Sequence, residues 1–188
     1  LPSDQLNVLM ISPKTRKGSG GNSLAIESLK VLDSLNVQVQ VEFLRPASLS
    51  SLSEHLAEHP DHYHLAHFDA IASSTTSAMD LEDEAGSGVS APSAQIGEIL
   101  SRAGVPLVLL NVAAEDPPNA NQAWAELTSG LVSAGVPATV TVPFSLVGPA
   151  RDLFLQSFYQ ALVKGQDAGS AVSSARSALM DSPHRASP

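Results

Sequence analysis

Histidine is the residue type whose spacing in this sequence first suggests chemistry. Five of the six histidines fall within residues 55–67. His55 and His59 lie four positions apart on an expected helix, a spacing that can chelate zinc. No carboxylate or third histidine has an obvious reason to converge on that pair, so we expect no metal and no cofactor. His67 lies on an expected strand, and we interpret it as a partly buried structural histidine.

Two further polar segments have compositions that occur in catalytic or phosphate-binding loops. Residues 73–76 read Ser-Ser-Thr-Thr. A serine nucleophile needs a base nearby, but neither this loop nor the loop that follows residues 110–113 contains a histidine. Residues 14–21 are rich in Lys, Gly and Ser and follow an expected strand. They lack both the Walker pattern and the dinucleotide-binding glycine pattern. We interpret both segments as polar loops.

The charge of the chain narrows the choice of partner. The formal net charge is -9, and an acidic surface repels both phosphate backbones and anionic membranes. We therefore expect no nucleic-acid partner and no membrane partner. An acidic run over residues 80–84 lacks the spacing of an EF-hand loop. We interpret this run as a solvated hairpin, with a docking patch for a basic partner as the alternative.

Short apolar segments that alternate with amphipathic ones would have to position these residues. The segments 7–12 and 104–111 are continuously apolar, which is typical of strands buried on both faces. Residues 37–43 alternate apolar and polar side chains, which is typical of an edge strand with one buried face. Further strands are expected at 69–72 and 135–142, and helices at 22–35, 48–59, 92–103, 122–134, 150–164 and 167–180, with a long polar stretch over 73–90.

This alternation predicts an α/β fold, a three-layer α/β/α sandwich with a mostly parallel sheet and helices on both faces. In such a sheet, ligands bind beyond the carboxyl ends of the central strands. The candidate site therefore lies in the loops that follow residues 69–72 and 110–113. We expect one domain over residues 1–188, with its core at about 6–180 and a polar tail at 181–188. Both ends of the chain have the composition of linkers in a longer protein.

Seven segments, in order and spacing, resemble the CHAT domain, a caspase-like peptidase domain often found beside TPR repeats in bacteria. They lie at residues 8–13, 41–46, 63–69, 104–111, 134–138, 158–162 and 174–179. The resemblance implies a caspase-like sheet of flavodoxin-like strand order. It also implies a catalytic dyad, a histidine in a Gly-His-Gly sequence and a cysteine in Leu-Asn-Ala-Cys.

Both members of that dyad are replaced in this chain. The Gly-His-Gly positions read Ala70-Ile71-Ala72, and the cysteine position is Ala113 in Leu110-Asn111-Val112-Ala113. The whole chain contains no cysteine. Cleavage of an amide by this dyad needs a thiolate to attack and an imidazole to transfer the proton. Ile71 and Ala113 supply neither, so we expect no peptidase activity of this kind.

We therefore expect a catalytically inactive CHAT-like domain that acts as a protein-interaction or regulatory module. Its binding residues would be Asp69, Asn111, Glu115 and Asp116. Its partner would be a protein or peptide, and the more specific hypothesis is a basic one. A homodimer through a sheet edge is an alternative mode of association. Two other functions stay open, a hydrolase with a displaced catalytic apparatus and a small-molecule sensor. The lack of disulfides and of an export signal predicts a cytoplasmic location.

Overall fold

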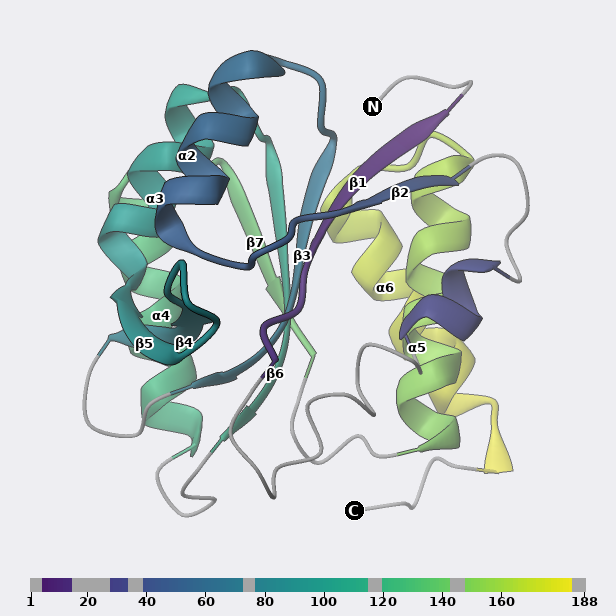
Figure 1. The fold of residues 1–188 in the computed structure, drawn as a ribbon. Coiled ribbons are helices and arrows are strands. Elements are labelled where there is room, and N and C mark those ends of the chain that lie inside the picture. Colours follow the sequence, from purple (N-terminus) through teal and green to yellow (C-terminus); the bar gives the residue numbers. More distant parts are fainter. Residues whose placement is uncertain are drawn as a thin grey trace.

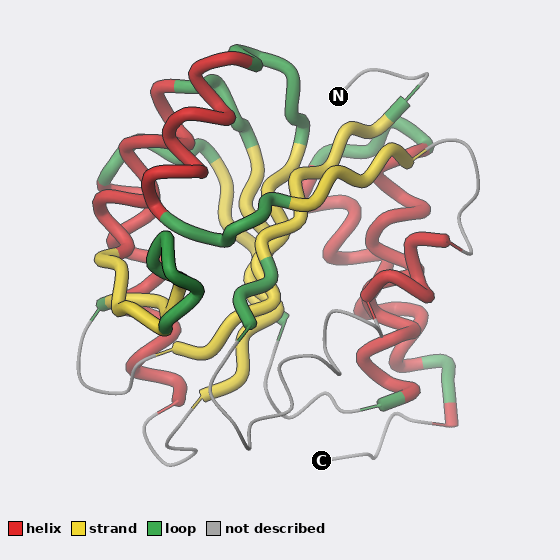
Figure 2. Tube along the Cα trace, in the orientation of Figure 1, coloured by secondary structure: helices red, strands yellow, loops and turns green. Residues whose placement is uncertain are grey.

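A computed structural model describes residues 5–14, 28–33, 39–72, 77–114, 120–142 and 148–183, with the backbone alone described at 70–72, 112–114 and 120. Helices and strands alternate along most of the chain (Figures 1 and 2). The elements are β1 (Leu6–Ile11), β2 (Val39–Phe43), α2 (Leu49–Glu58), β3 (Leu65–Ala72), β4 (Ala78–Glu82), β5 (Gly88–Pro92), α3 (Ser93–Arg102), β6 (Leu107–Ala114), α4 (Ala120–Ser133), β7 (Ala138–Thr141), α5 (Pro149–Val163) and α6 (Ala168–Met180). Residues 28–33 are also helical.

Five parallel strands form the centre of the sheet, in the order β2-β1-β3-β6-β7. Helices α2, α3 and α4 lie on one face of it, and α5, α6 and residues 28–33 lie on the other (Figure 1). The expected three-layer α/β/α sandwich with a mostly parallel sheet is therefore confirmed. Within the described residues, β2 pairs with β1 alone, so residues 39–43 form an edge strand as expected.

Alternation along the central strands divides the core between the two helical layers. On β1, Leu9 and Ile11 join the apolar cluster beneath α2, α3 and α4. Val8 and Met10 join the cluster beneath α5 and α6. β1 and β6 read as continuous apolar runs because each strand supplies both clusters.

Two turns of the same sequence connect helices to the strands that follow. Gly104 and Gly135, each within Ala-Gly-Val-Pro, adopt φ of 73° and 99°, a left-handed region that favours glycine. The following N–H groups, of Val105 and Val136, donate to carbonyls of the last helical turn, at Leu100 and Leu131. Such a turn ends α3 and α4 and leads into β6 and β7.

Residues 73–90 were expected as a long polar stretch with a hairpin at the acidic run 80–84. The structure has an antiparallel hairpin there, but its arms are the strands β4 and β5, which were not expected. The hairpin joins the sheet through the pair Ala72 and Met79 at the end of β3. Ala78, Met79 and Leu81 of β4 are buried in the core. The polar residues around them hide these apolar positions in the sequence. No helix in the described part of the chain has the length and apolar character needed to cross a bilayer.

The acidic run on this hairpin is only partly solvated. Asp83 and Glu84 are exposed, as expected of a solvated hairpin, but Glu82 is only 3% exposed. One Glu82 carboxylate oxygen accepts the backbone N–H of Lys14 and the other accepts that of Ala47, at 3.0 Å for the latter. Glu82 therefore ties the hairpin to the segments that follow β1 and β2.

Candidate functional site at the carboxyl ends of β3 and β6

The site is built on two neighbouring parallel strands. β3 and β6 pair over seven positions, among them Asp69 with Asn111 and Ile71 with Ala113. Paired strands of a sheet lie about 4.8 Å apart. The backbones of the two positions expected for the dyad are therefore direct neighbours across the two strands. β3 begins at Leu65, before the expected segment 69–72, and ends with it at Ala72, whereas β6 continues past the expected segment 104–111 as far as Ala114. The replaced dyad positions therefore lie within regular strands.

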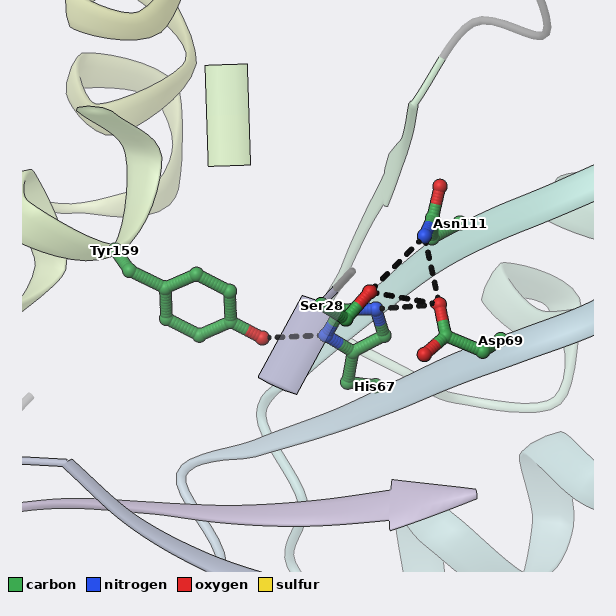
Figure 3. A network of polar contacts seen from close by, with 5 residues as sticks. All are labelled: Ser28, His67, Asp69, Asn111 and Tyr159. Carbon is green, nitrogen blue, oxygen red and sulfur yellow. Dashed lines mark hydrogen bonds and ion pairs between the residues drawn. The ribbon is translucent and has the colours of Figure 1, made fainter. Parts of the chain in front are cut away.

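Asp69 is the centre of a buried network of polar side chains (Figure 3). Its Oδ1 atom accepts hydrogen bonds from Asn111 Nδ2 at 2.6 Å and from Ser28 Oγ at 3.1 Å. His67 Nε2 lies 3.2 Å from the same oxygen. Asn111 Nδ2 also reaches Ser28 Oγ at 3.2 Å. All four residues are at most 3% exposed, so these bonds form away from solvent and keep the carboxylate satisfied on one oxygen.

His67 links the carboxylate to the helical layer. Its Nδ1 atom lies 2.6 Å from the hydroxyl of Tyr159 on α5. Because Nε2 donates to the carboxylate, a neutral ring leaves Nδ1 to accept from that hydroxyl. Burial, together with the charge of Asp69, raises the pKa of Tyr159 well above its usual value, so the hydroxyl keeps its proton. His67 is fully buried, more so than expected, and structural within this network.

Strand alternation explains why this network forms. His67, Asp69 and the paired Asn111 follow Leu65 and Leu109 at even spacing, so they share the face covered by α5 and α6. Toward their carboxyl ends, β3 and β6 therefore change from apolar to polar side chains on this face of the sheet only. The other face remains apolar, with Phe68 and Leu110 in the cluster beneath α2, α3 and α4.

One buried atom of the network, Asp69 Oδ2, has no hydrogen-bond donor among the residues that the structure describes. A buried carboxylate oxygen without a donor is costly, by about 1–3 kcal/mol. The atom therefore has unused capacity to accept a hydrogen bond at the carboxyl end of β3.

The structure brings two of the four expected binding residues together. Asp69 and Asn111 are bonded neighbours, and both are buried. Glu115 and Asp116 lie outside the described residues. Ser28 and Tyr159 join the network without having been expected from sequence. Tyr159 follows Phe158 in an apolar run that indicates only a buried helix face, and Ser28 carries no local signal of its partner.

Three further histidines, His55, His59 and His62, form a separate cluster with Tyr63 beside α2 and β2. The hydroxyl of Tyr63 donates to Glu42 at 2.5 Å and lies 2.5 Å from His55 Nε2. The His59 ring stacks on that of His55 at 4.6 Å, and its Nδ1 donates to the His55 carbonyl. No three metal-ligating side chains in the described residues are arranged to hold an ion. The cluster packs the end of α2 against the sheet.

The fold and the placement of the site define a three-layer α/β/α domain with polar residues at the carboxyl ends of its central parallel strands. Comparison with protein families matches the CHAT domain to residues 17–188. The chain therefore belongs to the CHAT domain family, whose domains are related to peptidases. No curated protein matches the chain.

Proposed function

We propose that this chain is a catalytically inactive CHAT domain that acts as a protein-interaction or regulatory module. The observation that carries the proposal is the absence of cysteine from the whole sequence. The dyad mechanism needs a thiolate at the end of β6, where this chain has Ala113, and an imidazole at the end of β3, where it has Ile71. His67 does not replace that imidazole, because both of its ring nitrogens are engaged inside the core.

The retained register supports a role in binding. β3 and β6 keep seven paired positions that extend through Ile71 and Ala113, so the backbone around the replaced dyad is regular. A partner protein or peptide would bind at this edge, near Asp69, Asn111, Glu115 and Asp116. Asp69 is buried, so it would favour a basic group on the partner through its negative charge beneath this edge and not through direct contact. The side chains would then recognise a partner without cleaving it.

An enzyme with a displaced catalytic apparatus is the rival function, and an activity assay separates the two. The full chain is incubated with fluorogenic peptides that end in Arg or Lys, and in parallel with a fluorophosphonate that labels activated serines. Our proposal predicts turnover no faster than in buffer and no covalent labelling. Saturable turnover or stoichiometric labelling of a serine would establish a hydrolase instead.

Association through a sheet edge is a further part of the proposal. β2 and β7 each pair with a single strand among those described, and an edge strand can hydrogen-bond to another chain. Sedimentation equilibrium over a concentration series tests for a homodimer. A strict monomer at the highest concentration would exclude the homodimer and leave the interaction role to other partners.

A further inference from the structure

A groove runs along the outer face of α4. It consists of two adjoining hollows, of about 570 Å³ and about 410 Å³, that share Ala125 and Ser129. The larger hollow extends from α4 to Thr141 at the end of β7. The other lining residues are Asn121, Trp124, Thr128 and Val132 in the larger hollow, and Ser77, Gln122, Glu126, Gly130 and Ser133 in the smaller.

The lining offers an apolar floor with small polar groups at its margin. Val132 is 49% exposed, although it is a large apolar side chain. Trp124 lines the same hollow. Glu126 is the one charged residue of the lining, and its oxygens accept from Gln122 at 3.0 Å and from Ser77 at 3.5 Å. A groove of this kind can hold an apolar side chain of a peptide.

The layer that carries the groove is strongly acidic. Between Pro46 and Ala150 the sequence has one Lys or Arg, Arg102, against twelve Asp and Glu. Of these twelve, Asp69 faces the opposite helical layer, and Glu115 and Asp116 lie outside the described residues. Those that the structure describes as exposed are Glu54, Glu58, Asp61, Asp83, Glu84 and Glu98. All six belong to α2, α3 and the loops on their side of the sheet (Figure 1). The field of this layer attracts cations and repels acidic segments.

The opposite helical layer gives the contrast. In the described residues from 28–33 and 148–183, the basic residues Lys30, Arg151, Lys164 and Arg176 are matched in number by Asp33, Asp152, Asp167 and Asp181. The excess of negative charge is therefore concentrated on the side of the sheet where the groove lies. Charge and shape together indicate the chemistry of what the groove accepts.

We propose that the α4 groove binds a short basic peptide segment of a partner protein, with one apolar side chain anchored against Trp124 and Val132. The lysines or arginines that flank the anchor interact with the acidic layer. The lining residues of the groove do not include Asp69, Ile71, Asn111 or Ala113. Variants of the groove and variants of the replaced dyad region can therefore be tested separately.

Trp124 provides a direct measurement, because it is the sole tryptophan of the chain. The probe is a series of capped heptapeptides, Lys-Arg-Ala-X-Ala-Arg-Lys, in which X is Leu, Phe, Met or Val. We expect a saturable change in Trp124 emission with at least one of them, and binding at least about tenfold weaker when X is Ser. A peptide with Glu in place of Lys and Arg should give no saturable change.

Two matched variants distinguish the groove from general charge attraction. Val132→Lys places a cation in the groove, whereas Val89→Lys adds the same charge at a valine of similar exposure, 45%, on the β4–β5 hairpin. We expect Val132→Lys to weaken binding about tenfold or more and Val89→Lys to weaken it less than about twofold. Equal effects of the two variants, or no saturable signal from any peptide of the series, would overturn the proposal.

Discussion

Ile71 and Ala113 are paired positions on neighbouring parallel strands, two residues beyond the hydrogen-bonded pair Asp69 and Asn111. This register therefore places the two replaced positions at the carboxyl ends of β3 and β6, with the buried polar network directly before them on the same strands. The network ties β3 and β6 to α5 and to residue 28, so the geometry of the strand ends depends on it. Two predictions concern the stability that these contacts provide, and a third concerns the separate bond between His64 and Asn7.

Asn111→Asp should destabilise the fold strongly at neutral pH. The change is nearly isosteric, but it replaces a donor 2.6 Å from Asp69 Oδ1 with a second carboxylate in a buried site. We expect a loss of about 3 kcal/mol or more in the free energy of unfolding, measured in urea at pH 7. Because two buried carboxylates favour uptake of one shared proton in the folded state, the loss should shrink as the pH is lowered toward 5.

Gln122→Glu is the matched control for that variant. Gln122 Nε2 likewise donates to a carboxylate, Glu126 at 3.0 Å, but the pair is exposed. Water screens like charges there, so we expect a change below about 1 kcal/mol. Similar losses for the two variants would show that the Asp69 site is accessible to water and would contradict the buried network.

Tyr159→Phe should cost about 1–3 kcal/mol in the free energy of unfolding. The variant removes the hydroxyl 2.6 Å from His67 Nδ1 and leaves that buried nitrogen without a partner. Tyr63→Phe is the comparison, because its partners His55 and Glu42 have side chains that are 20% and 43% exposed. Water can replace the Tyr63 hydroxyl, so the smaller loss should come from this variant. A larger loss for Tyr63→Phe than for Tyr159→Phe in thermal or urea unfolding would refute the buried bond between Tyr159 and His67.

His64 should make the fold sensitive to mild acid. Its Nδ1 accepts the backbone N–H of Asn7 at 2.9 Å, a bond that needs a lone pair on that nitrogen. Burial, with a smaller effect of His62, lowers the pKa of His64 below its usual value of 6.5. The unfolded chain then binds more protons near pH 6, so the stability contributed by His64 is present above about pH 6.5 and is lost as the pH falls below it.

His64→Asn tests this contribution, because an amide oxygen can accept from Asn7 without titrating. We expect the variant to show a shallower dependence of unfolding free energy on pH between 7 and 5 than the native chain. His62→Asn, in a residue that is exposed and does not make this bond, is the control. An unchanged slope for His64→Asn would mean that other groups cause the acid sensitivity.

The sequence predicted the parallel sheet and its helical layers well, because apolar periodicity and the repeated Ala-Gly-Val-Pro turns are local signals. It indicated a hairpin at the acidic run 80–84 but not the strands β4 and β5 on either side, because polar residues interleave with their buried apolar ones. Asp69 and Asn111 could be placed together, because parallel strands bring their carboxyl ends to one edge. Ser28 and Tyr159 could not, because they lie on helical segments, and no strand register fixes which of their side chains face the sheet.

The measurement that tests the central claim most directly compares peptide hydrolysis by the native chain and by Ile71→His/Ala113→Cys, with and without Ala70→Gly and Ala72→Gly. The native chain should hydrolyse fluorogenic Arg and Lys peptides no faster than buffer. The variants should show turnover that alkylation of the new thiol abolishes, since paired strands already hold the two positions side by side. Turnover by the native chain above the buffer rate, unaffected by thiol reagents, would contradict the account.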